Sequence, residues 1–150
     1  MDELRDLYQA TILDHNKKPR NFGALENADR KADGHNPLCG DKLTVYLELE
    51  DDRVVDVAFE GAGCAISTAS ASLMTERVKG RRIAEIEEDF CRFHELVTSA
   101  PDAPVNIGSH GKLAVFSGVR EYPMRVKCAT LAWHTLRAAI GNRGTTAKTE

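Results

Sequence analysis

The stretch from Glu60 to Ser72, EGAGCAISTASAS, is the feature that most constrains how this chain can fold. It begins where an alternating apolar segment ends and continues as a run of small residues that suit a helix. Gly61 and Gly63 provide the backbone freedom for a sharp turn from strand to helix. Cys64 is therefore expected at or just before a helix N-terminus, where unpaired N–H groups and the helix dipole favour the thiolate.

Two further cysteines lie in comparable surroundings. Cys39 lies in NPLCGD, and Cys128 lies in RVKCATLAW, just ahead of another predicted helix. The three cysteines follow the spacing C-x24-C-x63-C, which is far too wide for a local zinc finger. Only tertiary folding could bring them together.

The segment from Lys42 to Phe59 is predicted to be an antiparallel β-hairpin. Apolar residues alternate along both of its halves, and Asp51-Asp52 separates the halves as a turn. A hairpin brings its outer ends together. We therefore expect Cys39–Asp41 and Gly61–Cys64 to meet at one edge of the sheet.

The remaining pattern predicts helices around this hairpin, with a short pairing strand near Lys31–His35. The expected fold class is α+β, a small antiparallel sheet packed against several helices. The predicted helices are one through Ile12 that ends within Asn16–Pro19, then Ala65–Lys79, a segment carrying Ile83 to Val97, and Cys128–Ile140. The segment Ser99–Gly118 is expected to be irregular, with a helical turn near Leu113–Phe116. Residues 1–150 are expected to form one domain, with a frayed tail over 141–150.

Composition limits the classes of function. With 150 residues, 42% of them hydrophobic, the chain can bury a core of its own. A net charge of −3 and the lack of a basic run argue against nucleic-acid binding. We expect no membrane association and a cytoplasmic location, since no long apolar stretch or signal-peptide pattern occurs. Four cysteines in that compartment indicate metal or sulfur chemistry rather than disulfides.

Three thiolates and one carboxylate form the candidate metal site. Asp41 lies two residues beyond Cys39, on the same side of an extended segment. Together with Cys64 and Cys128, these residues make a set suited to tetrahedral zinc or to part of an iron–sulfur cluster. The carboxylate is the hard member of a soft set, so it should exchange most easily. The alternative is that the cysteines are small buried hydrophobic residues, which is common for one cysteine but less so for three in such settings.

The segments NPLCGD, GAGCAISTAS and RVKCATLAW resemble the three cysteine motifs of the U-type iron–sulfur cluster assembly proteins (NifU N-terminal, IscU and SufU). The likeness spans nearly the whole chain and is greatest to the SufU branch. Lys127 stands where the IscU branch carries a histidine, and the Ser99–Tyr122 region is longer than in that branch. The resemblance implies a SufE/NifU-like fold, a zinc site formed by Cys39, Asp41, Cys64 and Cys128, and a SufS-type cysteine desulfurase as partner.

Other polar residues carry weaker hypotheses. Lys127 could stabilise the thiolate of Cys128, and Arg125 could contact an anion or a partner; for Lys127, a solvated lysine at a helix start is an equal alternative. Cys91 and His94 share one stripe of a helix, but no third ligand is evident in the sequence, so no ligand role is expected. His134 is expected to pack or to lie at the surface, and the serines of ISTASAS are expected to allow close helix packing.

Two functions remain open. The first is a zinc-dependent sulfurtransferase that accepts persulfide sulfur from the desulfurase, on Cys39, and passes it to downstream iron–sulfur assembly proteins. The second is a scaffold that holds a nascent iron–sulfur cluster on the same cysteines, with iron or a transient cluster in place of zinc. A purely structural zinc domain is a third reading, but it would not need an exchangeable Asp41.

Overall fold

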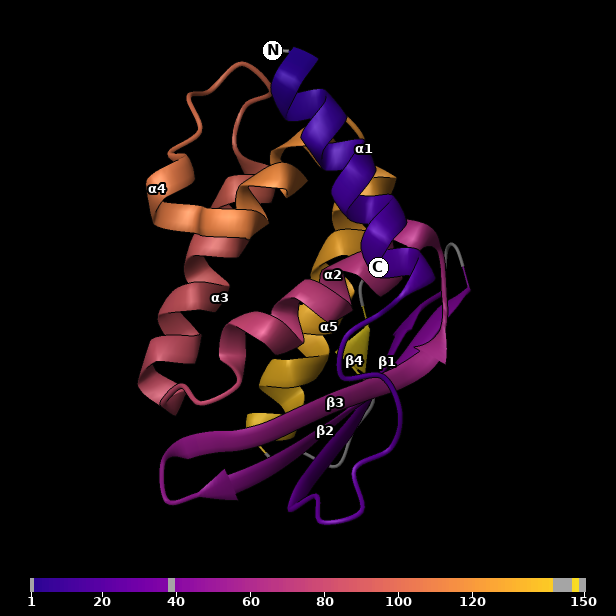
Figure 1. The fold of residues 1–150 in the computed structure, drawn as a ribbon, viewed down its shortest axis with the longest axis vertical. Coiled ribbons are helices and arrows are strands. Elements are labelled where there is room, and N and C mark those ends of the chain that lie inside the picture. The colour runs from indigo at the N-terminus through magenta and orange to yellow at the C-terminus, as the bar shows by residue number, and fades with distance from the viewer. Residues whose placement is uncertain (1, 38–39, 142–146, 149–150) are drawn as a thin grey trace.

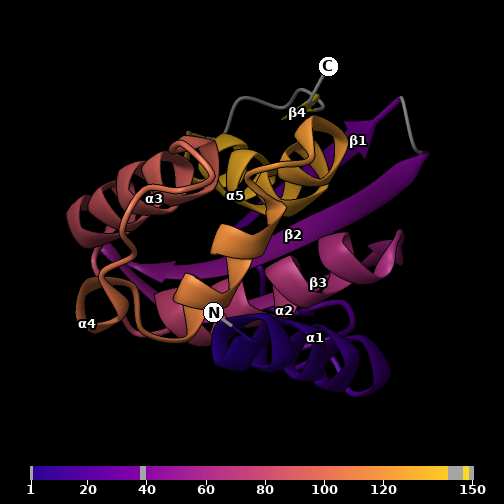
Figure 2. The ribbon, with the colours of Figure 1, turned by 90° about the horizontal axis from the view of Figure 1, so that it is seen from above.

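The computed structural model describes residues 2–37, 40–141 and 147–148. A twisted sheet forms one layer, and the helices gather on one of its faces (Figures 1 and 2). This arrangement confirms the expected α+β class, with antiparallel strands packed against several helices.

The sheet has the strand order β3-β2-β1-β4. β1 (Arg30–Asn36), β2 (Asp41–Glu50) and β3 (Arg53–Ala62) pair antiparallel, which confirms both the hairpin and the third strand expected from the sequence. Asp51 adopts a φ of 57° in the tight β2–β3 turn. β4 (Ala147–Lys148) adds a short parallel pair at Gly34 and His35. The rest of the tail expected to fray, 142–146 and 149–150, lies outside the described residues.

The first three helices match the expected ones, and the structure differs from the expectation in two later regions. The helices are α1 (Asp2–Lys17), α2 (Ala65–Val78), α3 (Ile83–Thr98), α4 (Ile107–His110), the 3₁₀ helix η1 (Gly111–Val119) and α5 (Pro123–Gly141). The helical turn expected near Leu113–Phe116 is confirmed within η1, but the prediction that the rest of the second half of 99–118 is irregular is wrong, because α4 and η1 run from Ile107 to Val119. There the apolar run Leu113–Phe116 is buried and packs in the core. The predicted start of the last helix near Cys128 is also wrong, because Pro123, whose fixed φ suits a first helical position, begins α5 five residues earlier.

Small residues allow α2 and α5 to pack closely above the sheet. Ser67, Ser70 and Ser72 are buried on α2, as expected for residues that serve close packing. Ser70 Oγ donates a hydrogen bond to the carbonyl oxygen of Ala129 on α5, at 2.5 Å. This hydrogen bond ties α2 to α5 at Ala129, the residue that follows Cys128.

A glycine lets α5 approach β1. A Cβ atom at Gly34 would overlap Thr135 Oγ1 and lie 3.1 Å from Thr135 Cβ and 3.3 Å from Leu131 Cδ1. Thr135 Oγ1 donates to the carbonyl oxygen of Leu131 at 2.7 Å, so its side chain is held in that orientation. The absence of a side chain at Gly34 therefore sets the height of α5 above the sheet.

A buried histidine joins α1 to α2. His15 Nδ1 lies 2.7 Å from Ser72 Oγ, which also accepts a hydrogen bond from the backbone N–H of Arg20 at 2.8 Å. Because Ser72 Oγ accepts the N–H of Arg20, its hydroxyl proton can be donated to Nδ1 of a neutral His15. Burial lowers the pKa of His15, and the charge of Arg20 lowers it further. The carboxylates of Glu76 and Asp14 raise this pKa, and the charge of Lys112 lowers it.

An ion-pair cluster fastens α3 to the end of α2. Asp89 on α3 is buried and accepts hydrogen bonds from Arg77 and Arg81, at 3.1 and 2.8 Å. A carboxylate in this position requires both partners, because an uncompensated buried charge is strongly destabilising. These ion pairs hold α3 in place next to α2. The outer face of α3, together with α5, lines a cavity described below.

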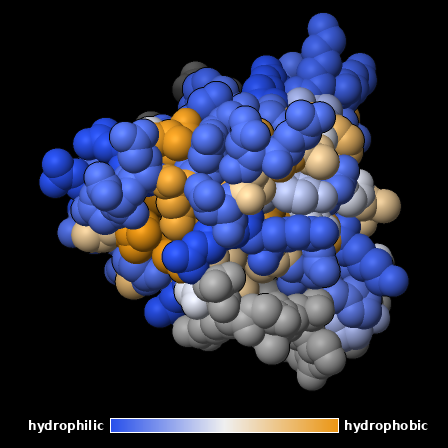
Figure 3. Space-filling view, turned by 90° about the horizontal axis from the view of Figure 1, so that it is seen from below, coloured by the Kyte–Doolittle hydropathy of each residue, from blue (hydrophilic) through white to orange (hydrophobic). Residues whose placement is uncertain are grey.

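The face of the molecule seen from below is largely hydrophilic and is crossed by a short hydrophobic stripe (Figure 3). Among the described residues, no helix combines the length and apolar character needed to cross a membrane.

Candidate metal centre

Three of the four predicted ligands converge at one end of the sheet. Asp41 is the first residue of β2, Cys64 immediately precedes α2, and Cys128 is carried by α5. One donor atom from each lies within 4.8 Å of the other two. Within the described part of the chain, no other trio of His, Cys, Asp or Glu side chains is gathered this closely.

The β3–α2 turn presents Cys64 as the sequence predicts. Cys64 is the N-cap of α2, and its sulfur accepts a hydrogen bond from the backbone N–H of Ser67 at 3.4 Å. Gly61 adopts a φ of +143°, and a Cβ atom there would lie 2.6 Å from Leu43 Cα on the neighbouring strand. The end of β3 that leads into the turn therefore requires a glycine at this position.

Asp41 is bound to the same turn. The backbone N–H of Cys64 donates to Asp41 Oδ1 at 2.8 Å, and Cys64 Sγ lies 3.6 Å from Asp41 Oδ2. Gly63 makes this contact sterically feasible, because a Cβ atom on it would lie 3.0 Å from Asp41 Oδ1. Asp41 is only 2% exposed. One of its carboxylate oxygens accepts the backbone N–H of Cys64, and the other faces the Cys64 sulfur.

Cys128 is buried within α5, in a position that the sequence analysis did not predict. It is the sixth residue of the helix counted from Pro123, so it is held by a formed turn of helix and is not at the helix start. The amide of Asn36, itself fully buried, donates to Cys128 Sγ at 3.9 Å. Asn36 was missed as a site residue, although it opens the NPLCGD motif that also carries Cys39 and Asp41.

The electrostatics of the site favour a thiolate at Cys64. Its pKa is lowered from 9.0 to about 7, chiefly by the hydrogen bond with the Cys128 side chain. The backbone N–H groups of Ser67 and Ile66 act in the same direction, whereas burial and the Asp41 carboxylate oppose them. These hydrogen bonds therefore favour the thiolate of Cys64, the form that binds metals.

The remaining predicted site residues have different outcomes. Cys39, proposed both as a ligand and as the catalytic residue, lies outside the described residues. Its flanks are described: Asn36 pairs with Asp41 across the β1–β2 hairpin, and the N–H of Gly40 donates to the carbonyl oxygen of Asn36 at 2.8 Å. Lys127 is half-buried next to Cys128, and the guanidinium of Arg125 lies over the Tyr122 ring, 4.5 Å from its centroid.

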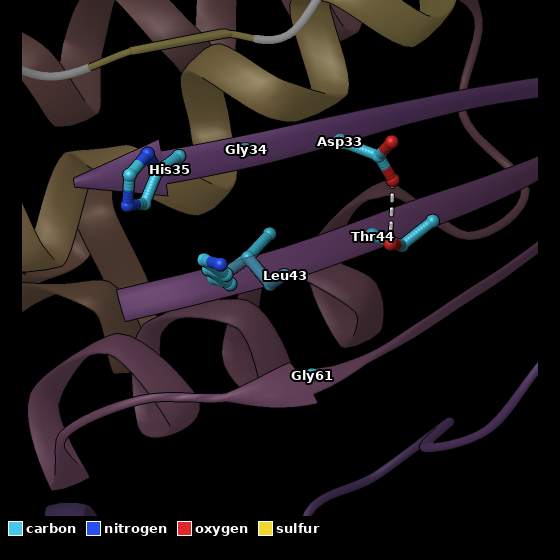
Figure 4. Close-up of a pocket in the computed structure, with 7 residues that line it drawn as sticks. Asp33, Gly34, His35, Leu43, Thr44 and Gly61 are labelled. Atoms are coloured by element: carbon cyan, nitrogen blue, oxygen red, sulfur yellow. Dashed lines mark hydrogen bonds between the residues drawn. The ribbon is translucent and has the colours of Figure 1, made fainter. Parts of the chain in front are cut away.

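A pocket lies near the same end of the sheet. It spans the ends of β1, β2 and β3 and has a volume of about 350 Å³ (Figure 4). His35 and Lys42 bring basic groups to it, while Asp33 accepts a hydrogen bond from Thr44 Oγ1 at 2.7 Å. Its lining includes Lys42, the residue after Asp41, but not Asp41, Cys64 or Cys128 themselves.

Comparison with known proteins identifies the family. Residues 7–129 match the family described as "NifU-like N terminal domain". The "Iron-sulfur cluster assembly scaffold protein IscU" of Streptococcus pyogenes serotype M1 is 36% identical over 140 residues, covering 93% of this chain and 86% of that protein. The "Zinc-dependent sulfurtransferase SufU" of Bacillus subtilis is 38% identical over 138 residues, covering 91% of each chain.

The fold agrees with this relationship. The crystal structure of FiSufU from the thermophile Fervidobacterium islandicum AW-1 superposes with a TM-score of 0.81 at 36% identity, covering 91% of this chain and 98% of that one. The cysteine motifs, the α+β architecture and the sequence similarity agree. This chain belongs to the NifU-like N-terminal domain family of iron–sulfur cluster assembly proteins.

Proposed function

We propose that this protein is a zinc-dependent sulfurtransferase of iron–sulfur cluster assembly, which accepts persulfide sulfur from a SufS-type cysteine desulfurase. The observation that carries the proposal is the convergence of Asp41, Cys64 and Cys128 donor atoms within 4.8 Å. A relative of this chain over 91% of its length is named a zinc-dependent sulfurtransferase, which supports the same assignment.

The spacing of the donor atoms suits zinc. Zinc–sulfur and zinc–oxygen bonds of about 2.3 and 2.1 Å in a tetrahedron put sulfur and oxygen ligands about 3.6 Å apart. Cys64 Sγ and Asp41 Oδ2 are already 3.6 Å apart. Cys39 is our proposed fourth ligand: it precedes Asp41 by two residues, so the chain limits the separation of their Cα atoms to about 7 Å. When bound, zinc would hold the cysteines as thiolates at neutral pH.

The sulfur-transfer step uses one thiolate as nucleophile. The thiolate of Cys39 attacks the terminal sulfur of the persulfide on the desulfurase. The sulfur–sulfur bond of the donor breaks, the desulfurase cysteine leaves as a thiolate, and Cys39 becomes the persulfide. No net oxidation or reduction occurs, and an acceptor thiolate then takes the sulfur by attacking the terminal sulfur of the Cys39 persulfide, so that Cys39 leaves as a thiolate.

The other ligands are proposed to stay in place while Cys39 reacts. Cys64 is held by the first turn of α2, and Cys128 by α5 and the Asn36 amide. Asp41 remains tied to the N–H of Cys64 through one oxygen, so its second oxygen stays aligned with the site. Lys127, adjacent to Cys128, is proposed to favour the thiolate there.

Mass spectrometry can test the transfer directly. After incubation with desulfurase and cysteine under non-reducing conditions, we expect one added sulfur atom on the Cys39 peptide. Cys39→Ala should abolish the stimulation of the desulfurase, whereas Cys91→Ala, a change at an exposed cysteine, should preserve it. Added sulfur on Cys128 in a functional Cys39→Ala protein would show that the acceptor is misassigned.

The names of the relatives favour a second function, an assembly scaffold. Several relatives are named iron–sulfur cluster assembly scaffold proteins, including the one from Streptococcus pyogenes. On this reading the same cysteines would hold a nascent cluster. The metal content of aerobically purified protein separates the two functions: one colourless zinc per chain supports sulfur transfer, and a brown iron-containing chromophore supports the scaffold.

A further inference from the structure

A second cavity gathers cysteine and histidine side chains away from the candidate metal centre. It lies between α3 and α5, has a volume of about 520 Å³, and is separate from the centre formed by Asp41, Cys64 and Cys128. Its lining residues are Phe90, Cys91, His94, Glu95, Thr98, His134 and Arg137. The sequence offered Cys91 and His94 without a third ligand, and the packing of α5 against α3 supplies His134.

The two imidazoles face the same aromatic wall. The ring centroids of His94 and His134 are 6.4 Å apart, and the Phe90 ring lies 6.1 Å from the first and 5.3 Å from the second. Cys91 precedes His94 by three residues on α3, so both side chains lie on the same side of that helix. One residue of each helix thus brings an imidazole to the cavity, and Cys91 brings a sulfur.

The charge around the cavity suits a cation. Glu95 contributes a carboxylate, and Cys91 would contribute a thiolate on binding a metal. The one basic side chain in the lining, Arg137, is engaged elsewhere: its guanidinium lies over the Phe90 ring, 4.9 Å from the centroid, and its Nε lies 3.5 Å from Glu87 Oε2. The guanidinium is thus partly engaged by Glu87 and Phe90. Burial lowers the pKa of His134, and the positive charge of Arg137 still lowers it further.

We propose that Cys91, His94 and His134 form a second binding site, for a divalent transition-metal ion of borderline softness such as Zn²⁺. One thiolate and two imidazoles are the ligands that such ions select. The three donor atoms are not already within 4.8 Å of one another, so Cys91 and His94, which are exposed, must rotate towards His134. This site consequently binds more weakly than the metal centre and fills after it.

Alkylation of individual cysteines tests the site without any activity assay. Full-length protein that has taken up one equivalent of zinc is treated with iodoacetamide before and after a second equivalent is added, and each cysteine peptide is quantified by mass spectrometry. The second equivalent should slow alkylation of Cys91 by roughly tenfold or more, because a metal-bound sulfur is a poor nucleophile. His94→Ala and His134→Gln should each restore rapid alkylation of Cys91.

The controls separate this site from the metal centre. His110→Gln changes a histidine outside the cavity and should leave the protection of Cys91 intact. Mg²⁺, a hard cation that prefers oxygen ligands, should give no protection. Unchanged alkylation of Cys91 with added zinc, or protection that persists in both histidine variants, overturns the proposal. The Cys64 and Cys128 peptides report on the metal centre in the same experiment, so failure of the proposed zinc function would be seen separately.

Discussion

Gly34→Ala is the substitution that most directly tests how α5, and with it Cys128, is seated on the sheet. The added Cβ atom would overlap Thr135 Oγ1 and come within 3.1 Å of Thr135 Cβ. Thr135 cannot turn away freely, since its hydroxyl donates to the carbonyl oxygen of Leu131 at 2.7 Å. Either that side chain rotates and gives up the hydrogen bond, or α5 shifts away from β1.

Both responses reduce the free energy of unfolding. Loss of the hydroxyl bond costs about 1 kcal/mol, and overpacking typically costs about 1–3 kcal/mol. The smaller entropy of the unfolded alanine chain returns about 0.4–1 kcal/mol. If both responses contribute, we therefore expect a net loss of about 1–3.5 kcal/mol, which corresponds to a melting temperature lower by roughly 2–14 °C in a chain of this length.

Thermal unfolding followed by circular dichroism measures this effect, and a second substitution checks its cause. Thr135→Ala removes the overlapping hydroxyl, so Gly34→Ala/Thr135→Ala should recover at least half of the loss relative to Thr135→Ala alone. Gly108→Ala is a suitable control, because its Cβ atom would meet only Asn106 Oδ1, at 3.3 Å. A Gly34→Ala protein that melts with the wild type, or a double variant with no recovery, would refute the proposed steric role of Gly34.

Three further predictions concern the metal centre and the α1–α2 contact. Removing zinc with a chelator should lower the melting temperature by roughly 8–16 °C, since a ligand at a thousand times its dissociation constant stabilises by about 4 kcal/mol; an unchanged melt after verified removal would contradict this. Gly63→Ala should weaken zinc binding by about tenfold, measured by competition with a chromophoric chelator, because its Cβ atom would displace the Asp41 carboxylate. Since burial lowers the folded-state pKa of His15, its stabilising effect is complete above pH 6.5 and is lost as the pH falls below that value. The difference in melting temperature between wild type and His15→Gln should therefore shrink between pH 7.5 and pH 5.

The sequence was sufficient where local pattern determines geometry. Alternation along Lys42–Phe59 identified the hairpin, and a hairpin necessarily joins its outer ends, so the meeting of Asp41 with Cys64 could be predicted before any tertiary contact was known. The small residues that follow Gly63 likewise predicted the start of α2 and the position of Cys64 at its N-terminus.

The sequence was insufficient where tertiary packing determines the structure. The 3₁₀ segment from Gly111 to Val119 has no helical periodicity of its own and is stabilised by burial of its apolar residues. The role of Asn36 also depends on docking, because only the seating of α5 on β1 brings its amide to Cys128. The start of α5 is an exception, because Pro123 is a local signal for it, whereas the apolar pattern of Leu131, Leu136 and Ile140 indicates only the later part of the helix.

The distribution of the proposed metal ligands along the chain has a consequence for the order of events during synthesis. Asp41 and Cys64 belong to one hairpin and the turn after it, whereas Cys128 is added 64 residues later than Cys64. At translation rates of about 5–20 residues per second, this interval lasts roughly 3–13 s. Throughout that time the growing chain carries the thiol of Cys64 but still lacks the Cys128 sulfur on α5. Closure of the metal centre therefore has to wait until α5 has emerged and docked.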